Sequence, residues 1–162
     1  MDNDKPKKVK LTPHQARLKL ESYCAYQERS QQEVRNKLYE YGLYPNEVEQ
    51  IITELIEQNF LNEERFACAY VNGKFNMKKW GKQKIIQGLK LKQVSPPLIK
   101  LAMKEINEND YYEALSLLLD KKEANLKEAD PYKKKIKLVQ YGLSKGYENS
   151  LLWEVLKNKE VE

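Results

Sequence analysis

The stretch SQQEVRNKLYEYG, residues 30–42, contains three features that together predict an α-helix. It begins with a serine followed three residues later by a glutamate, which is the spacing of a capping box. Apolar side chains then recur at intervals of three and four residues, which places them on one face of a helix. A glycine follows, and glycine readily adopts the left-handed conformation that ends a helix. The residues concerned are Ser30 and Glu33, then Val34, Leu38 and Tyr41, and last Gly42.

The same features recur along the whole sequence and predict an all-α fold. Thr12 and Gln15 repeat the capping spacing, and Ser95 and Asp130 directly precede prolines that suit the first turn of a helix. Strand signals are weak, because no sustained run alternates between apolar and polar residues. The predicted helices lie near residues 13–28, 31–41, 45–58, 63–77, 82–92, 96–108, 110–127, 131–145 and 148–158.

The predicted helices repeat in groups of three. A shift of 51 residues carries Val34, Leu38, Leu55 and Phe60 onto Ile85, Leu89, Ile106 and Tyr111, and a further shift of 53 carries Gln93 and Ile99 onto Gly146 and Leu152. Units of about 50 residues bury too little surface to be comfortably stable alone, so we expect three small bundles leaning on one another in an elongated array. The second and third helices of each unit resemble a helix-turn-helix. The predicted units are residues 12–59, 62–109 and 110–159.

Charge is segregated along the sequence, although the net charge is only +5. Residues 28–64 hold nine acids against three basic residues, whereas residues 65–104 hold ten basic residues and no acid. Ordinary surfaces intersperse the two signs, so this basic block predicts a positive surface suited to phosphates or to an acidic protein groove. Its members are Arg65, Lys74, Lys78, Lys79, Lys82, Lys84, Lys90, Lys92, Lys100 and Lys104.

Two features near this charge have two interpretations each. Trp80, between lysines, suits stacking on a base or a cation–π contact, but a tryptophan at a turn between helices also commonly packs against a neighbouring bundle. The tract YKKKIK, residues 132–137, is a weaker second basic candidate, because lysines near a helix start are common on solvated surfaces. The sequence leaves both pairs of interpretations open.

The sequence lacks the residues of a recognisable catalytic site, so we expect no enzyme activity, no metal and no cofactor. His14 is the only histidine and lies just inside a predicted helix start, where a surface position is expected. Cys24 and Cys68 lie far apart and outside any CxxC spacing, which predicts buried thiols and argues against zinc. Glu63 and Glu64 are better placed to complement a helix N-terminus than to act as a carboxylate pair.

The sequence also carries no sign of a membrane protein. No apolar run approaches the roughly 18 residues of a membrane span. The N-terminal stretch MDNDKPKKVKLTPH lacks the apolar middle of a secretory signal. We therefore expect a cytoplasmic protein with no membrane partner.

Three stretches of the sequence resemble the RecX regulatory proteins: RSQQEVRNKLYEYG, NFLNEERFACAYV and WGKQKIIQGLKLKQV. The family pattern runs RS-x-x-E-L with a later L-x-x-x-G, then D-D-x-x-F-A, then G-x-x-x-I-x-x-x-L-x-x-x-G-I. The sequence departs from it at Asn62 and Glu63, where the family has two aspartates, and at Gln93, where it has a glycine. The resemblance covers residues from about 12 to 159. The matching residues are Arg29, Ser30, Glu33, Leu38, Gly42, Phe66, Ala67, Gly81, Ile85 and Leu89.

The resemblance implies three tandem three-helix repeats and a modulator of RecA. Such proteins lodge in the groove of the RecA filament on DNA and inhibit its ATPase, strand-exchange and coprotease activities in DNA repair and the SOS response. For this chain we therefore expect a monomer that binds the RecA filament and binds single- or double-stranded DNA weakly and without sequence preference. The expected RecA and DNA contacts are Arg65, Lys74, Lys78, Lys79, Trp80, Lys82, Lys84, Lys90 and Lys92.

Two other functions stay open on the sequence alone. One is a stand-alone helix-turn-helix DNA-binding protein that reads DNA with residues 83–91 or 98–104. Few Arg, Asn or Gln residues populate these helices, so base readout looks poor. The other is a protein-binding scaffold, whose affinity for its partner would depend little on salt.

Overall fold

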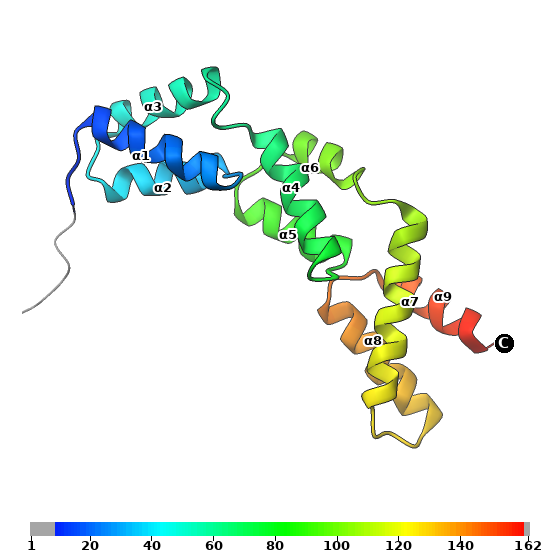
Figure 1. Ribbon diagram of the computed structural model, residues 1–162. Helices are drawn as coiled ribbons and strands as arrows, with labels where there is room; N and C mark the ends of the chain where they lie inside the picture. The colour runs from blue at the N-terminus through cyan, green and yellow to red at the C-terminus, as the bar shows by residue number, and fades with distance from the viewer. Residues whose placement is uncertain (1–8, 161–162) are drawn as a thin grey trace, which may run out of the picture. The chain divides into compact units, whose positions relative to one another are not determined.

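The computed structural model describes residues 9–160, and within that range the protein contains helices and no strand (Figure 1). The predicted all-α fold is confirmed. The N-terminal stretch MDNDKPKKVKLTPH, which lacks the apolar middle of a secretory signal, lies mostly in residues 1–8, outside the described residues. The helices of the described residues are α1 (Pro13–Tyr26), α2 (Gln31–Glu40), α3 (Pro45–Glu57), α4 (Glu63–Asn76), α5 (Lys82–Leu91), α6 (Pro96–Met103), α7 (Glu108–Asn125), α8 (Pro131–Ser144) and α9 (Asn149–Glu160).

Most helices begin where the capping residues predicted them. At α1 the Thr12 hydroxyl accepts a hydrogen bond from the Gln15 backbone N–H at 3.2 Å, and the Thr12 N–H donates to the Gln15 side chain at 3.1 Å. Asp130 accepts two backbone hydrogen bonds at the start of α8, whereas the Ser95 hydroxyl makes no such bond at α6. Helix α7 starts two residues before the predicted position 110, because Asn107 caps the helix and starts it at Glu108.

The turn after the second helix of each group of three contains a residue with positive φ. These residues are Gly42 (φ 79°), Gln93 (φ 60°) and Gly146 (φ 95°). After α8 the N–H of Tyr147 donates to the carbonyl of Gly142 at 3.1 Å, and the N–H of Gly146 donates to that of Leu143, which together form a Schellman motif. Gln93, at the family's glycine position, therefore takes the same left-handed conformation despite its side chain.

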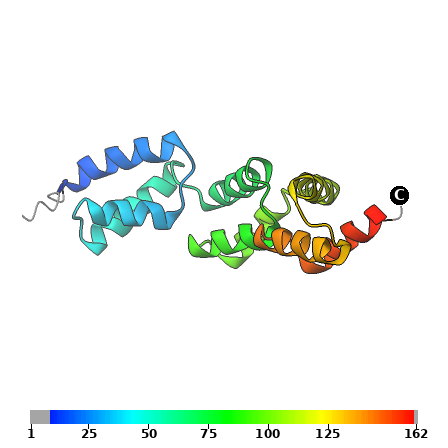
Figure 2. The same ribbon diagram turned by 90° about the horizontal axis from the view of Figure 1, so that it is seen from below.

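The described residues divide into two compact units, and the first comprises residues up to Ala67 together with Lys92–Val94. It contains α1, α2 and α3, which pack on one another as a three-helix bundle (Figure 2). Its centre is formed by apolar side chains from every helix of the bundle, because the three- and four-residue spacing puts them on the inner faces. The buried residues include Ala16, Leu20, Val34, Leu38, Val48, Ile51, Ile52 and Leu55.

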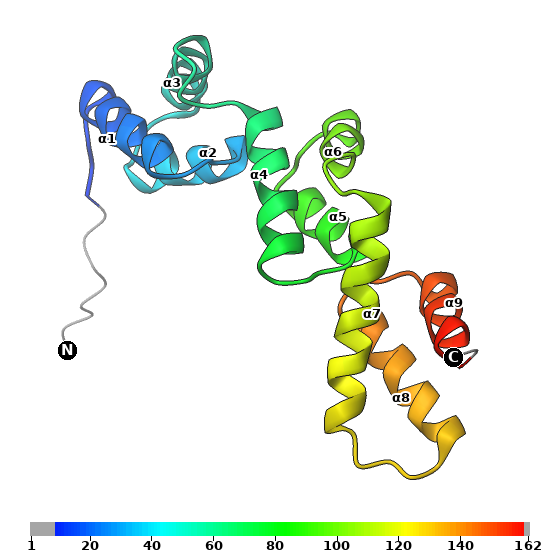
Figure 3. The ribbon, with the colours of Figure 1, turned by 45° about the vertical axis from the view of Figure 1, so that its right-hand side comes forward.

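The second unit comprises Cys68–Leu91 and the residues from Ser95 onward. α5 packs on α6, and α7, α8 and α9 pack on one another, with α7 and α8 running antiparallel (Figure 3). This unit contains most of α4 and all of the third group of helices, so it does not test the predicted boundaries at residues 62, 109 and 110. Those boundaries stay a prediction.

The structure shows how far the two cysteines, the histidine and the paired glutamates are buried and where they lie. Cys24 is buried, and its burial raises the pKa of that thiol to about 11, whereas Cys68 is partly exposed. The prediction of buried thiols is thus confirmed for one of the two. His14 is exposed, as predicted, and Glu63 and Glu64 stand in the first turn of α4. Within residues 9–160 no helix combines the length and apolar character needed to cross a membrane.

Candidate nucleic-acid interface

The centre of the basic block is the turn between α4 and α5. Lys79 has a left-handed backbone (φ 56°), and its N–H donates to the carbonyl of Phe75 at 3.1 Å. The N–H of Trp80 then donates to the carbonyl of Lys74 at 3.1 Å. These bonds turn the chain back on the end of α4. Trp80 therefore lies next to a lysine of the helix that precedes it.

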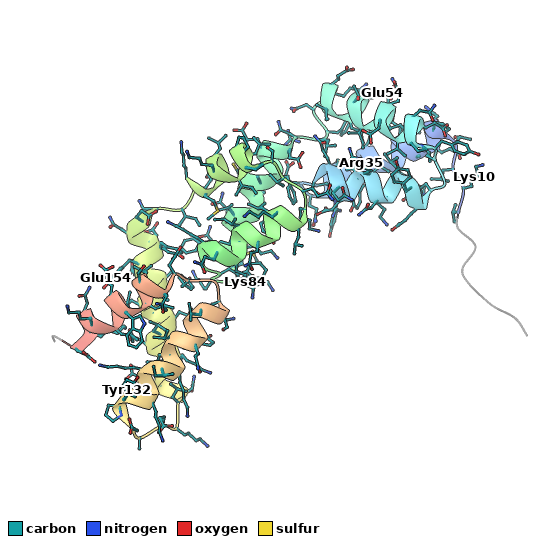
Figure 4. The ribbon with its side chains drawn as sticks, turned by 180° about the vertical axis from the view of Figure 1, so that it is seen from behind. Lys10, Arg35, Glu54, Lys84, Tyr132 and Glu154 are labelled. Atoms are coloured by element: carbon teal, nitrogen blue, oxygen red, sulfur yellow. The ribbon has the colours of Figure 1, made fainter. Side chains whose placement is uncertain are left out.

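Trp80 holds two lysines over its ring. The Nζ of Lys74, from α4, lies 4.8 Å from the ring centre, and the Nζ of Lys84, from α5, lies 4.4 Å from it. Figure 4 labels Lys84 on α5. Both distances are within the range of a cation–π interaction. Lys74 Nζ also lies 5.3 Å from the ring centre of Tyr70. The indole is partly buried, so it combines the packing and the cation–π interpretations.

Most lysines of the block have no acidic partner within the described residues. No carboxylate oxygen lies within ion-pair distance of them there, although eleven other ion pairs form along the same part of the chain. Uncompensated ammonium groups leave a positive potential that attracts phosphates. The lysines concerned are Lys74, Lys78, Lys79, Lys84, Lys90, Lys100 and Lys104.

Arg65 instead links separate segments of the first unit through an ion pair and hydrogen bonds. Its Nε is 2.6 Å from a carboxylate oxygen of Glu28, and its Nη2 donates to the backbone carbonyls of Asn59 and Phe60. Asn59 has a positive φ of 64° just after α3, and the guanidinium binds two carbonyls of the loop that follows this helix. Its charge and donors are thus engaged within this unit, and its role in binding stays a prediction.

Two of the predicted contact lysines are also engaged with acids. Lys92 Nζ lies 3.1 Å from a carboxylate oxygen of Glu33 within the first unit. Lys82 Nζ, in the second unit, lies 2.5 Å from Glu108 and 4.6 Å from the ring centre of Tyr111. Their roles in binding stay predictions. The remaining predicted contacts are Trp80 and the lysines that make no ion pair within the described residues: Lys74, Lys78, Lys79, Lys84 and Lys90.

Within the second unit, the basic turn is held directly by the turn between α8 and α9. The N–H of Gly81 donates to the carbonyl of Lys145 at 2.7 Å, and the hydroxyl of Tyr147 donates to the carbonyl of Lys79 at 2.9 Å. A Cβ on Gly81 would lie 2.3 Å from the carbonyl carbon of Gly146, so only glycine permits this approach. We call this pair of turns the inter-turn joint.

Tyr111, at the start of α7, completes the inter-turn joint. Its hydroxyl accepts a hydrogen bond from the N–H of Lys82 at 3.0 Å and donates one to Glu148 at 2.7 Å. Its ring stacks on that of Tyr147 at 5.1 Å. Burial raises the pKa of Tyr111 and of Tyr147, so both hydroxyls stay protonated donors. Sequence reasoning missed this joint, and its one signal was the glycine at position 81.

The second basic candidate, residues 132–137, is largely neutralised. Lys134 Nζ lies 3.1 Å from Glu123, Lys137 Nζ lies 2.8 Å from Glu128, and Lys135 pairs with Glu160. The hydrogen bond from Lys137 lowers the pKa of Glu128. These pairs favour the interpretation of this tract as a solvated helix surface.

Three models of RecX domains match successive parts of the chain. The first three-helix domain matches residues 16–55, the second matches 62–103 and the third matches 108–156. Among solved structures, the chain is similar to the crystal structure of RecX from Lactobacillus salivarius, with a TM-score of 0.84 and 21% identity. That match covers 93% of this chain and 97% of the other, and it supports the three-helix repeat fold.

Curated relatives agree with these matches. The regulatory protein RecX of Haemophilus influenzae (strain PittGG) is 31% identical over 85% of this chain and 90% of its own length. The regulatory proteins RecX of Clostridium perfringens (strain 13) and Clostridium acetobutylicum are 32% and 35% identical. These alignments cover 83% and 80% of this chain, and they span 65% and 61% of the lengths of the two relatives. The three domain matches and the Haemophilus relative together establish that this chain belongs to the RecX family of regulatory proteins.

Proposed function

We propose that the chain is a non-enzymatic inhibitor of RecA recombinase filaments on DNA, acting in the cytoplasm during DNA repair. The observation that carries this proposal is the cluster of lysines around Trp80, which have no acidic partner among residues 9–160, on a chain that belongs to the RecX family. Such a cluster suits the phosphates of filament-bound DNA or an acidic surface of RecA. The protein lowers the ATPase, strand-exchange and coprotease activities of RecA by occupying the filament groove.

The inter-turn joint supports this mode of action. Backbone hydrogen bonds and a stacked tyrosine pair fix the basic turn against the turn between α8 and α9 within one compact unit. An inhibitor that occupies a groove must resist the subunit motions it blocks, and a rigid mount for the contact residues serves this purpose. A monomer with one such surface is sufficient for this role.

RecA ATPase activity on single-stranded DNA tests the proposal. At amounts stoichiometric with RecA, the protein is expected to lower the rate, and the Gln variant of Lys74, Lys78, Lys79 and Lys84 is expected to inhibit much less. The matched control replaces four lysines of residues 132–137 by Gln, which removes the same charge from the ion-paired tract. Unchanged ATPase activity with the unaltered protein refutes the proposal, and equal loss in both variants assigns the effect to net charge alone.

The stand-alone helix-turn-helix alternative has less support. Ile85 and Leu89 of α5 are buried, and every charged side chain of that helix is a lysine, which contacts phosphates and does not specify bases. A binding selection on random duplex DNA distinguishes the two functions. Recovery of one defined sequence would favour the alternative.

A further inference from the structure

We propose that Lys74, Trp80 and Lys84 form a clamp for the phosphates of a single-stranded DNA backbone, in which the indole holds the two ammonium groups and stacks on no base. We call these three residues the indole clamp. This inference rests on the proposed function and names the ligand chemistry of the same surface. It assigns to the tryptophan a role that neither packing nor base stacking describes.

Two positively charged side chains lie over the same aromatic ring. Lys74 and Lys84 come from different helices, yet their Nζ atoms lie 4.8 and 4.4 Å from the same ring centre. The two ammonium groups are therefore no further apart than the sum of these distances. Neither has a carboxylate partner within the described residues. Two ammonium groups within this distance repel each other, and phosphates bound to them relieve that repulsion.

The site exposes ammonium charge to solvent rather than an open aromatic face. Base stacking needs an aromatic face that a base can cover. The ring of Trp80 is partly buried and already carries two ammonium groups, so its accessible feature is charge. Each ammonium group can donate hydrogen bonds to the oxygens of a phosphate while it stays over the ring. Contacts of this kind are independent of base sequence.

The clamp is ordered before any ligand binds. The N–H of Trp80 bonds to the carbonyl of Lys74, and the carbonyl of Lys79 accepts from Tyr147 of the inter-turn joint. The backbone that carries the indole is thus fixed at both sides. A free lysine loses considerable side-chain entropy when it is immobilised on a ligand. Lysines already held on an aromatic ring lose less, which strengthens binding.

Neighbouring residues extend the clamp into a short track. Lys78 and Lys79 are exposed and directly precede the indole, and neither is paired with an acid in the part of the chain that the structure describes. Single-stranded DNA has one negative charge for each nucleotide, so a row of ammonium groups suits consecutive phosphates. The clamp itself accounts for two phosphate contacts in this arrangement.

Binding to oligothymidylate and to an abasic strand of equal length, without RecA, tests the clamp. Trp80→Leu is expected to weaken binding to both strands equally, by about two- to fivefold for each lysine that loses its ring contact. The Lys74→Gln, Lys84→Gln double variant is expected to reduce the log-log salt slope by about 1.4, because two single-strand phosphate contacts are lost. The matched control is Trp153→Leu, since Trp153 is 38% exposed and no cation lies over its ring among residues 9–160. It should leave both affinities unchanged.

Two results overturn the clamp. Weaker binding to oligothymidylate with unchanged binding to the abasic strand would show that a base stacks on Trp80. Unchanged affinity and salt slope in the lysine double variant would show that these ammonium groups contact no phosphate. If Trp80→Leu lowers the melting temperature, the double variant decides, because it keeps the indole. Loss of the clamp with RecA inhibition intact removes this inference alone, whereas an intact clamp without RecA inhibition removes the proposed function alone.

Discussion

Replacement of Tyr111 by phenylalanine removes the hydroxyl at the centre of the inter-turn joint and keeps the ring. The hydroxyl accepts from the N–H of Lys82 at 3.0 Å and donates to Glu148 at 2.7 Å, and the side chain is 2% exposed. The stacking on Tyr147 and the contact with Phe75, at 6.0 Å between ring centres, remain in the variant. Any loss of stability therefore reports on the two hydrogen bonds.

The expected loss is about 2 to 3 kcal/mol in the free energy of unfolding. A hydrogen bond between neutral groups contributes about 1 kcal/mol, and one to a charged group contributes about 1.5 to 3 kcal/mol. The lower half of the second range applies, because Glu148 is partly exposed and water replaces part of the lost bond. The backbone N–H of Lys82 has no such replacement from the phenyl ring. The sum is large for a single hydroxyl group.

Urea denaturation followed by circular dichroism measures this loss. Tyr132→Phe is the control, because Tyr132 is 70% exposed, and its expected change is within about 0.5 kcal/mol. The same variant also tests the alkaline limit of stability. The folded protein keeps the buried Tyr111 hydroxyl neutral, whereas the unfolded chain ionises it near pH 10, so the unaltered protein loses stability above about pH 10. The variant should lose less over that range. A change below about 0.5 kcal/mol in Tyr111→Phe would refute the assigned role of the hydroxyl.

Three further predictions follow from single side chains. Gln93→Gly should stabilise the protein by about 0.5 to 1 kcal/mol in urea denaturation, because glycine adopts the positive φ without steric cost; a destabilised variant would contradict this. Arg65→Met should destabilise the first unit by about 2 to 3 kcal/mol, because the Glu28 carboxylate and the loop carbonyls after α3 lose their donor, and Arg65→Lys should recover only part of the loss. At pH 8 an alkylating reagent should modify Cys68 well before Cys24, because Cys24 is buried and its pKa is raised to about 11; equal rates by mass spectrometry would contradict that burial.

Local signals in the sequence were sufficient to predict the helices. Thr12 and Ser30 cap helices through atoms a few residues away, so a short window of sequence contains the whole interaction. The shift at the start of α7 has the same origin, because Asn107 and Asp110 are both residue types favoured at helix N-caps and lie within one turn. The shape of the turn at Gln93 was not visible locally, since the residue adopts a conformation that its own side chain disfavours.

The candidate site was only partly predictable, because its ion pairs join distant parts of the chain. Residues 65–104 contain no acid, but the acids that engage Arg65 and Lys82 lie at positions 28 and 108. Counting charges within a window cannot detect such partners. The sequence therefore predicted the existence of a basic surface, whereas the fold determined which of its lysines stay without an acid.

The indole clamp and the inter-turn joint share one short piece of backbone, and this sharing has a testable consequence. The joint holds the carbonyl of Lys79 and the N–H groups of Gly81 and Lys82, while the residue between them, Trp80, carries the clamp. Loosening the joint should therefore weaken DNA binding although no lysine is changed. Tyr111→Phe, measured at a temperature where the variant is still folded, is expected to lower affinity for oligothymidylate and the abasic strand alike. Its salt slope should stay as in the unaltered protein, because the same phosphates are contacted less well. Unchanged affinity in a measurably destabilised variant would show that the turn keeps its shape without the joint.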